Sequence, residues 1–440
     1  MKKKLIVFSA DAMVSEDVEY LKTLPNFKKY LAGGCMVRKV ESVYPTITYP
    51  CHVTMSSGVW PDKHGVTGNL QLIPGESQLP WKWDYSNTKW KEDIFTEAKK
   101  AGYTTAAVFW PVTGNHPAID YLIDEYWTQT PEDTPREAWK RMGSSEEMLD
   151  IVERHIGDNQ IRIHPPTERF IVSCTCDIIR QYQPDIMFLH PANIDAYRHH
   201  TGLFNDRILT GIEETDAWIG EIMKAVEDIG QLENTNLVLT SDHGQLDIKR
   251  IINPNVILAD HGLIRKDDKG ALSGWDAWCL SGGLSALVYL KNPEDREIYE
   301  KTYRLLNFMK EEGIYGISQV FTTKEADEKY HLDGPFSFVL ESDDYTSFGD
   351  SIVRPVVTNF EQSDYRYGRA THGHLPYKGP QPVFMAKGPD FAENVILEKG
   401  RLIDQAPTYA KLLGIELESA DGKAMESFIK NGKGYESGSH

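Results

Sequence analysis

The chain has 440 residues, with 47 lysines and arginines against 65 aspartates and glutamates, so its formal net charge is -18. Hydrophobic residues at 40% and charged residues at 25% are ordinary values for a globular protein, which excludes global disorder. Because so acidic a chain repels polyanions, we expect neither a nucleic acid polymer nor an anionic membrane surface as its primary partner.

The N-terminus and the cysteines indicate the compartment. Residues 5–9 form too short an apolar run for a secretory signal, and no run approaches the roughly 20 residues that span a bilayer. We therefore expect a cytoplasmic protein. The cysteines form an odd set without a CxxC pair, which argues against a disulfide framework and indicates reduced, packed thiols: Cys35, Cys51, Cys174, Cys176 and Cys279.

Short apolar runs alternate with amphipathic stretches along the chain. The runs are continuous, as is typical of parallel strands covered on both faces, and the stretches between them have helical periodicity. This alternation predicts an α/β fold with a doubly wound, mostly parallel sheet flanked by helices. In chain order, strands are expected at residues 5–8, 104–109, 186–189, 237–240 and 383–386, and helices at residues 16–31, 91–100, 146–155, 168–182 and 206–229.

The second half of the chain departs from this alternation. Residues 253–363 contain a charge cluster, a Gly-Gly pair and an acidic stretch, and we expect them to form an insertion or subdomain on the sheet. We expect residues 1–431 to form a single catalytic domain and residues 432–440 a flexible tail.

Aspartates follow three of the expected strands, namely Asp11, Asp195 and Asp242. In an open α/β sheet, ligands bind beyond the carboxyl ends of the strands. A single aspartate in such a place is usually a helix cap or a turn residue, but here histidines lie close to two of the three. With His372, these residues offer carboxylate and imidazole donors, which suit Zn²⁺ or Mn²⁺ better than Mg²⁺. Two divalent ions could be held.

Residues 44–52, Tyr-Pro-Thr-Ile-Thr-Tyr-Pro-Cys-His, offer a nucleophile. We expect Pro50 to open a short helix through Ser56, which places Thr48 at the helix N-terminus. Free backbone N–H groups and the helix dipole there favour an alkoxide and a bound phosphoryl group. On this segment alone, a plain helix cap is an equal alternative for Thr48.

Taken together, these residues resemble the alkaline phosphatase superfamily, most closely its nucleotide pyrophosphatase/phosphodiesterase branch. The matching motifs occur in the family's order and span most of the chain. They are Tyr44-Pro45-Thr46-x-Thr48-Tyr49-Pro50-x-His52, Gly58-x-x-Pro61-x-x-His64-Gly65-Val66-x-Gly68-Asn69, Asp195-x-x-x-His199, Ser241-Asp242-His243-Gly244 and Thr371-His372-Gly373.

The resemblance implies an alkaline phosphatase-like fold and a site with two zinc ions. It assigns Asp11, Thr48, Asp242 and His243 to one ion, and Asp195, His199 and His372 to the other. It selects Thr48 over Thr46 as the nucleophile and implies that Asn69 holds a nonbridging phosphoryl oxygen.

The resemblance also implies substrate contacts, although aromatic residues at such positions are more often core. Tyr49 replaces the phenylalanine that stacks on the nucleobase in many family members. Trp110 follows a strand where the family often places pocket residues, and Tyr121, Tyr126 and Trp127 could supply a second stacking wall. Arg198 stands where the family commonly has glycine, which puts the rim of the site in question.

The function this predicts is a two-zinc hydrolase that cleaves phosphodiester or pyrophosphate bonds of nucleotides or small phosphodiesters through a phosphothreonine intermediate. A phosphonate hydrolase or a phosphomonoesterase of the same superfamily is the first alternative. An inactive metal-containing binding protein is the second, although it would need neither Thr48 nor Asn69. The sequence does not indicate an oligomeric state.

Overall fold

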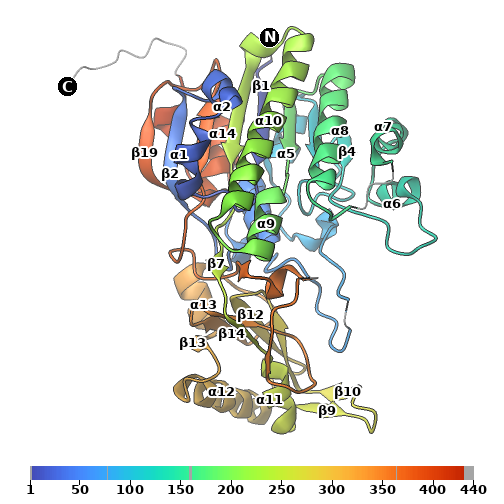
Figure 1. Cartoon of the computed structure of the whole chain (residues 1–440), viewed down its shortest axis with the longest axis vertical. Coiled ribbons are helices and arrows are strands. Elements are labelled where there is room, and N and C mark those ends of the chain that lie inside the picture. Colours follow the sequence, from blue (N-terminus) through green and yellow to red (C-terminus); the bar gives the residue numbers. More distant parts are fainter. Residues whose placement is uncertain (1, 77, 158–160, 363, 431–440) are drawn as a thin grey trace.

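An eight-stranded sheet forms the centre of the computed structural model, which describes residues 2–76, 78–157, 161–362 and 364–430 (Figure 1). Its strands follow the order β19-β2-β18-β6-β1-β5-β3-β4. All run in one direction except β18, which pairs antiparallel with both of its neighbours. The strands are β1 (Lys4–Ser9), β2 (Cys35–Glu41), β3 (Thr105–Val108), β4 (Tyr121–Ile123), β5 (Ile186–Leu189), β6 (Thr235–Thr240), β18 (Phe384–Lys387) and β19 (Ile396–Arg401).

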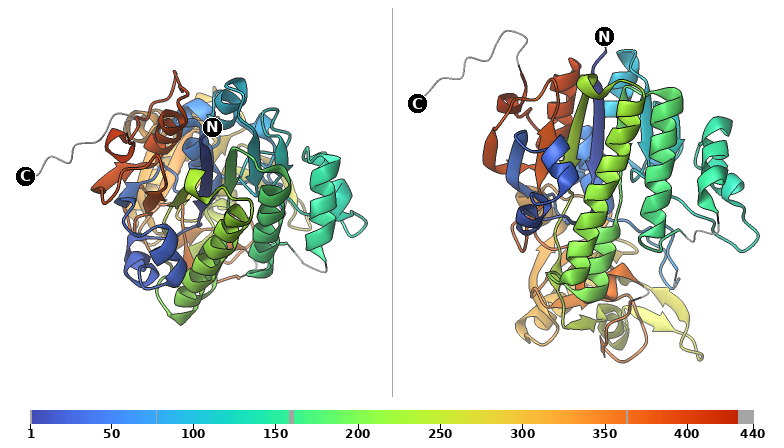
Figure 2. Two further views of the ribbon diagram at one scale, coloured as in Figure 1. Left: turned by 90° about the horizontal axis from the view of Figure 1, so that it is seen from above. Right: turned by 45° about the horizontal axis from the view of Figure 1, so that its top comes forward.

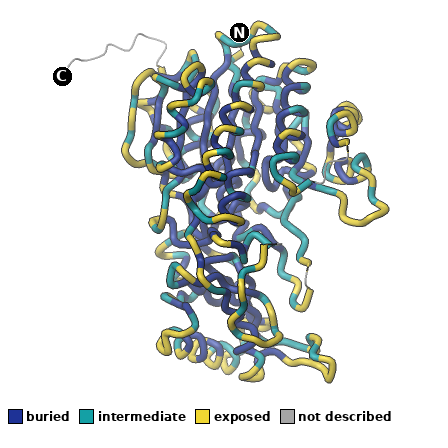
Figure 3. The backbone as a smooth tube through the Cα atoms, viewed as in Figure 1, coloured by how far each residue is buried: buried dark blue, intermediate teal, exposed yellow. Residues whose placement is uncertain are grey.

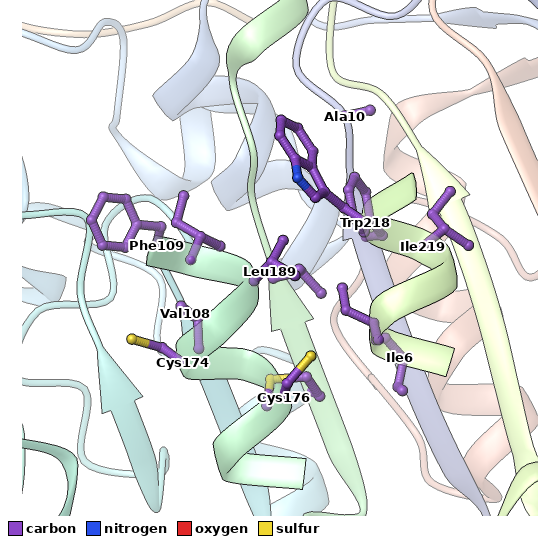
Figure 4. Packing of buried hydrophobic residues seen from close by; sticks show 14 of the residues in the cluster. Ile6, Ala10, Val108, Phe109, Cys174, Cys176, Leu189, Trp218 and Ile219 are labelled. Atoms are coloured by element: carbon purple, nitrogen blue, oxygen red, sulfur yellow. The ribbon is translucent and has the colours of Figure 1, made fainter. Parts of the chain in front are cut away.

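Helices cover both faces of this sheet, as the layers in Figure 2 show. The continuous apolar run of β1 explains why: Ile6 and Phe8 join the cluster beneath one set of helices, while Leu5 and Val7 join the cluster beneath the other. Figure 4 shows part of the first cluster, to which Ile6 of the sheet and Trp218 and Ile219 of α10 belong. The first face carries α2 (Pro25–Tyr30), α7 (Glu146–Ile156), α8 (Pro166–Tyr182) and α10 (Asp206–Asp228), and the second carries α3 (Thr48–Ser57), α5 (Ile94–Lys100) and α14 (Gln405–Leu413).

The architecture is the expected doubly wound α/β fold, with three local differences. The expected helix over residues 16–31 is divided into η1 (Ser15–Asp17), α1 (Val18–Leu21) and α2, because Leu24 is extended before Pro25, which starts α2. The expected strand at 383–386 is antiparallel, which periodicity cannot reveal. Strands β2, β4 and β19 were not predicted, and β19 lies at the sheet edge with mostly exposed residues.

A second, antiparallel sheet lies below the carboxyl ends of the main strands in Figure 1 and has its own buried core (Figure 3). It falls within the range expected as an insertion. Its strands, in the order β11-β12-β14-β13, are β11 (Ala277–Ser281), β12 (Ser285–Leu290), β13 (Ile317–Thr322) and β14 (Phe338–Ser342), accompanied by α11 (Pro254–Asp260), α12 (Arg296–Glu311), α13 (Thr323–Tyr330) and the hairpin β9 (Ile264–Lys266) to β10 (Leu272–Trp275).

Helix α6 (Pro135–Arg141) packs beside α7 at the side of the main sheet. The other short elements are α4 (Pro61–His64), α9 (Asn193–Thr201), β7 (Leu246–Asp247), β8 (Arg250–Ile252), β15 (Thr346–Phe348), β16 (Val357–Thr358) and β17 (Ala370–Thr371). All five cysteines are buried and unpaired by disulfides. No helix in the described ranges is both long and apolar enough to cross a bilayer. The tail expected at 432–440 lies outside the described residues.

Candidate active site

Two groups of acidic and imidazole side chains, all buried except the half-buried Asp195, lie beyond the carboxyl ends of the central strands. Within each group, one donor atom per residue lies within 4.8 Å of the donor atoms of the others. The segments after β1, β5 and β6 supply most of these residues, and the segment after β17 supplies His372. The first group is Asp11, Asp242 and His243, and the second is Asp195, His199 and His372.

Several polar atoms of these two groups make no hydrogen bond to the rest of the described chain. Asp11 Oδ1, Asp242 Oδ2, His199 Nε2 and His372 Nδ1 are buried and have no hydrogen-bond partner in the described part of the chain. Burial, and then repulsion from Asp195 and Asp242, raises the pKa of Asp11 well above its ordinary value. Such unpaired groups are costly to bury, and a divalent ion in each group would satisfy them. The residues therefore fit two ions, and mixed imidazole and carboxylate donors are typical of zinc.

Hydrogen bonds behind the donors set their orientation. The Nε2 atom of His190 lies 3.0 Å from Asp11 Oδ2. This contact leaves the other carboxylate oxygen, Asp11 Oδ1, to face the first group. Burial lowers the pKa of His190 to about 3, so the ring is neutral. His199 Nδ1 donates to the carbonyl of Ala370 at 2.7 Å, which directs His199 Nε2 toward the second group. Partners of this kind are a usual feature of metal sites. The sequence placed His190 after a strand but indicated no role for it.

His52 lies beside the first group but is fully engaged elsewhere. Its Nδ1 donates to the Thr48 carbonyl at 2.8 Å, and its Nε2 pairs with Ser9 Oγ at 2.9 Å. Although His52, His190 and Asp242 also have donor atoms within 4.8 Å of one another, His52 therefore has no nitrogen left for an ion. Its contact with Thr48 is structural and steadies the first turn of α3.

Thr48 is the first residue of α3 and does not cap that helix. Ile47 occupies the cap position, and the helix starts two residues before the expected Pro50. Thr48 Oγ1 lies 3.2 Å from His243 Nε2, at the first donor group. Thr46, by contrast, donates its hydroxyl to the carbonyl of His374 at 2.9 Å. Of the two threonines, Thr48 is therefore the one whose hydroxyl faces the site.

The side chain of Asn69 lies at the N-terminus of α3 and uses a backbone N–H group that was expected to be free for a bound phosphoryl group. The Tyr49 N–H donates to Asn69 Oδ1 at 2.9 Å, and Pro50 has no N–H to offer. Because the amide oxygen accepts this bond, the NH₂ group of Asn69 is left to donate elsewhere. Both Asn69 and Thr48 line the same cavity. A donor to an anion in the cavity would therefore be the side-chain NH₂ group of Asn69, which the Tyr49 N–H holds in position, rather than the Tyr49 N–H itself.

A cavity of about 350 Å³ is lined by Asp11 of the first donor group and by all three residues of the second, and its outer wall is aromatic and charged. The Arg162 guanidinium lies 4.9 Å from the ring centre of Trp81 and 5.0 Å from that of Trp127. Tyr365 packs on Trp81 and stacks on His372. Glu125 also lines the cavity, and burial raises its pKa to about 8. The volume lies in the range of small-molecule sites, about 300–1,000 Å³.

The three aromatic residues predicted to contact substrate are buried behind this wall. Tyr49 packs against Trp81 with ring centres 5.5 Å apart, Trp110 packs against His52, and Tyr126 packs against Trp83. None of the three lines the cavity. Their rings fill the core that supports the site, because the helix and strands carrying them turn them inward. The aromatic faces offered to a substrate belong instead to Trp81, Trp127 and Tyr365, of which the sequence suggested only Trp127.

Arg198, whose place in the motif put the rim of the site in question, does not line the cavity. Its side chain is fully buried and pairs with Asp17 at 2.5 Å. Its Nε donates to the Ala12 carbonyl at 3.2 Å. Arg198 thus fastens the loop that follows Asp11 and leaves the cavity unobstructed.

Comparison with protein families identifies this arrangement. The model of the type I phosphodiesterase / nucleotide pyrophosphatase family matches residues 5–350. The chain belongs to this family. An ectonucleotide pyrophosphatase/phosphodiesterase of Caenorhabditis elegans is 24% identical over 419 residues, which cover 94% of this chain and 47% of that protein. Human ectonucleotide pyrophosphatase/phosphodiesterase family member 1 is 25% identical over 265 residues, covering 58% and 25% of the two chains. The chain thus spans about half or less of the length of these relatives.

Solved structures have the same fold. Murine ectonucleotide pyrophosphatase/phosphodiesterase 5, in an inactive form in complex with AMP, superposes with a TM-score of 0.67 at 19% identity, covering 98% of this chain and all of the other. The human protein of the same name superposes equally well.

Proposed function

We propose that this family member is a two-metal hydrolase that cleaves phosphodiester or pyrophosphate bonds of nucleotides or small phosphodiesters, with Thr48 as the nucleophile. The observation that carries the proposal is the position of Thr48: its Oγ1 lies 3.2 Å from His243 Nε2, and it lines a cavity together with Asp11 of the first donor group and the whole second group. The names of these relatives and the AMP complex of the murine protein support a nucleotide substrate.

The chain's own residues would act as follows. The Thr48 oxygen attacks phosphorus, its bond to phosphorus forms as the bond to the leaving oxygen breaks, and a phosphothreonine results. Water then attacks phosphorus and releases Thr48. Throughout, the Asn69 amide donates to a nonbridging oxygen, where charge develops in the transition state. Divalent ions in the two donor groups, most suitably Zn²⁺ with Mn²⁺ as the alternative, would lower the pKa of the threonine hydroxyl and of water and stabilise charge on the phosphoryl group.

Substitution of Thr48 tests this proposal. We expect Thr48→Ala to abolish hydrolysis of bis-p-nitrophenyl phosphate in metal-replete protein while leaving the metal content near two ions per chain. Unchanged hydrolysis would exclude Thr48 as the nucleophile. Fewer than about two divalent ions in protein never exposed to chelator would contradict the two-metal site.

A phosphomonoesterase or phosphonate hydrolase is a second candidate because of Arg162. Its guanidinium lines the cavity, forms no ion pair with the described residues, and could neutralise an extra negative charge on the substrate. A comparison of kcat/KM for a diester, a monoester, a dinucleotide and a phosphonate on one preparation separates the candidates. Arg162→Gln should lower kcat/KM selectively for the monoester and the phosphonate if this second candidate is correct.

A further inference from the structure

The cavity contains a histidine–glutamate pair that belongs to neither donor group. His164 Nδ1 lies 2.6 Å from Glu168 Oε1, and both residues line the cavity. Glu168 is fully buried, and the same Oε1 accepts the Ala192 N–H at 3.2 Å. The Glu168 carboxylate thus holds the ring by Nδ1, and His164 Nε2 has no partner among the described residues.

The position of the pair relates it to one half of the site. Ala192 lies three residues before Asp195, so Glu168 is tied to the start of the helix that carries Asp195 and His199. Thr48, by contrast, contacts His243 of the other group. In an in-line displacement, the nucleophile and the leaving oxygen lie on opposite sides of phosphorus. A histidine on the Asp195 side is therefore placed toward the leaving oxygen.

The charges around the ring favour its protonated form. Burial alone would lower the pKa of His164, but Glu168 and Asp195 raise it above its ordinary value. Arg162 on the same segment opposes this effect. His190 and His200, on neighbouring elements, have lowered pKa values of their own, chiefly through burial and in part through His164. Because Glu168 contacts the ring directly, its contribution does not depend on whether the donor groups hold ions.

We propose that His164, held by Glu168, is the general acid that protonates the leaving oxygen. The proposal rests on the proposed function. As the Thr48–phosphorus bond forms and the bond to the leaving group breaks, the Nε2 proton passes to the departing oxygen, which leaves as an alcohol. In the second half, neutral Nε2 takes a proton from the attacking water while the phosphorus–Thr48 bond breaks. The imidazolium and the Thr48 alkoxide are thereby restored.

Two substrates that transfer the same group, thymidine 5′-phosphate, but differ in their leaving group test this role. The p-nitrophenyl ester of thymidine 5′-phosphate expels an anion that is stable near neutral pH, whereas thymidylyl-thymidine must expel an alkoxide. We expect His164→Gln to lower kcat/KM for the dinucleotide by about 10²- to 10⁴-fold and to change that of the aryl ester little. His155→Gln is the matched control, because His155 Nε2 pairs with Asp177 at 2.8 Å outside the cavity. It should alter neither.

An independent readout is the titration of His164 itself, followed by NMR of its ring in metal-free protein. Glu168→Gln should lower the pKa of His164 by about one unit or more and move the alkaline fall of dinucleotide cleavage to lower pH.

Equal losses with both substrates, or an unchanged pKa in Glu168→Gln, would overturn the proposal. A wild-type protein that cleaves the aryl ester but not the dinucleotide would also overturn it. Cleavage of neither substrate would instead refute the proposed function, and the NMR titration would still decide whether Glu168 holds a proton on His164.

Discussion

Two substitutions of Asn69 can separate the role of its amide oxygen from the role of its NH₂ group. Asn69 Oδ1 accepts the Tyr49 N–H at 2.9 Å, while its NH₂ group is free to donate within the cavity. Asn69→Ala removes both contacts. Asn69→Asp keeps an oxygen for Tyr49 and replaces only the donor with an acceptor. Comparison of the two variants therefore distinguishes a role in catalysis from a role in holding the helix.

The expected size of each effect follows from these contacts. Loss of one preorganised donor to a developing charge costs about 10²- to 10³-fold in kcat, or about 2.7–4 kcal/mol. The buried Tyr49 N–H left unpaired in Asn69→Ala costs a further ~1–3 kcal/mol of folding stability. Asn69→Asp should lose at least as much kcat as Asn69→Ala, because its carboxylate repels the phosphoryl group, but it should lose less stability.

The assay is kcat for bis-p-nitrophenyl phosphate, measured alongside urea unfolding and metal content. Asn255→Ala is a matched control, since Asn255 is a buried amide in the second sheet region that bonds both backbone groups of Cys279 at 2.8 Å. It should lose stability and retain kcat. A near-normal kcat in Asn69→Asp would refute the reasoning, because that variant has no donor.

Two further substitutions test the surroundings of the site. Burial raises the pKa of Glu125 to about 8, so this carboxyl is neutral below that pH and repels an anionic substrate above it. kcat/KM for the aryl ester should therefore fall above about pH 8, and Glu125→Gln should remove that fall; its persistence would contradict the assignment. Asp17→Asn leaves the buried guanidinium of Arg198 without its counter-charge, which should cost about 3–5 kcal/mol in urea unfolding. The double variant Asp17→Leu with Arg198→Met should recover much of this loss, and a single-variant cost below about 1 kcal/mol would show that the pair is unimportant.

The sequence by itself determined those features of this protein that depend on residues close together in the chain. Continuous apolar runs identified β1, β3, β5, β6 and β18, because buried strands must be apolar on both faces. The donor residues follow strands or begin the next helix, so their chain positions already placed them at one edge of the sheet. Thr48 could be named because its motif occurs in order with the others.

Only the tertiary structure decided which way side chains point and which distant segments meet. Tyr49, Trp110 and Tyr126 look like pocket residues in the sequence, but packing turns their rings into the core. The cavity wall comes from Trp81, Arg162 and Tyr365, which lie far apart in the chain, and periodicity carries no information about such contacts. The direction of β18 and the burial of Arg198 against Asp17 likewise depend on partners distant in sequence. The positions of the donor residues can thus be read from local motifs in this acidic chain of net charge -18, whereas the cavity around them forms only when distant segments pack together.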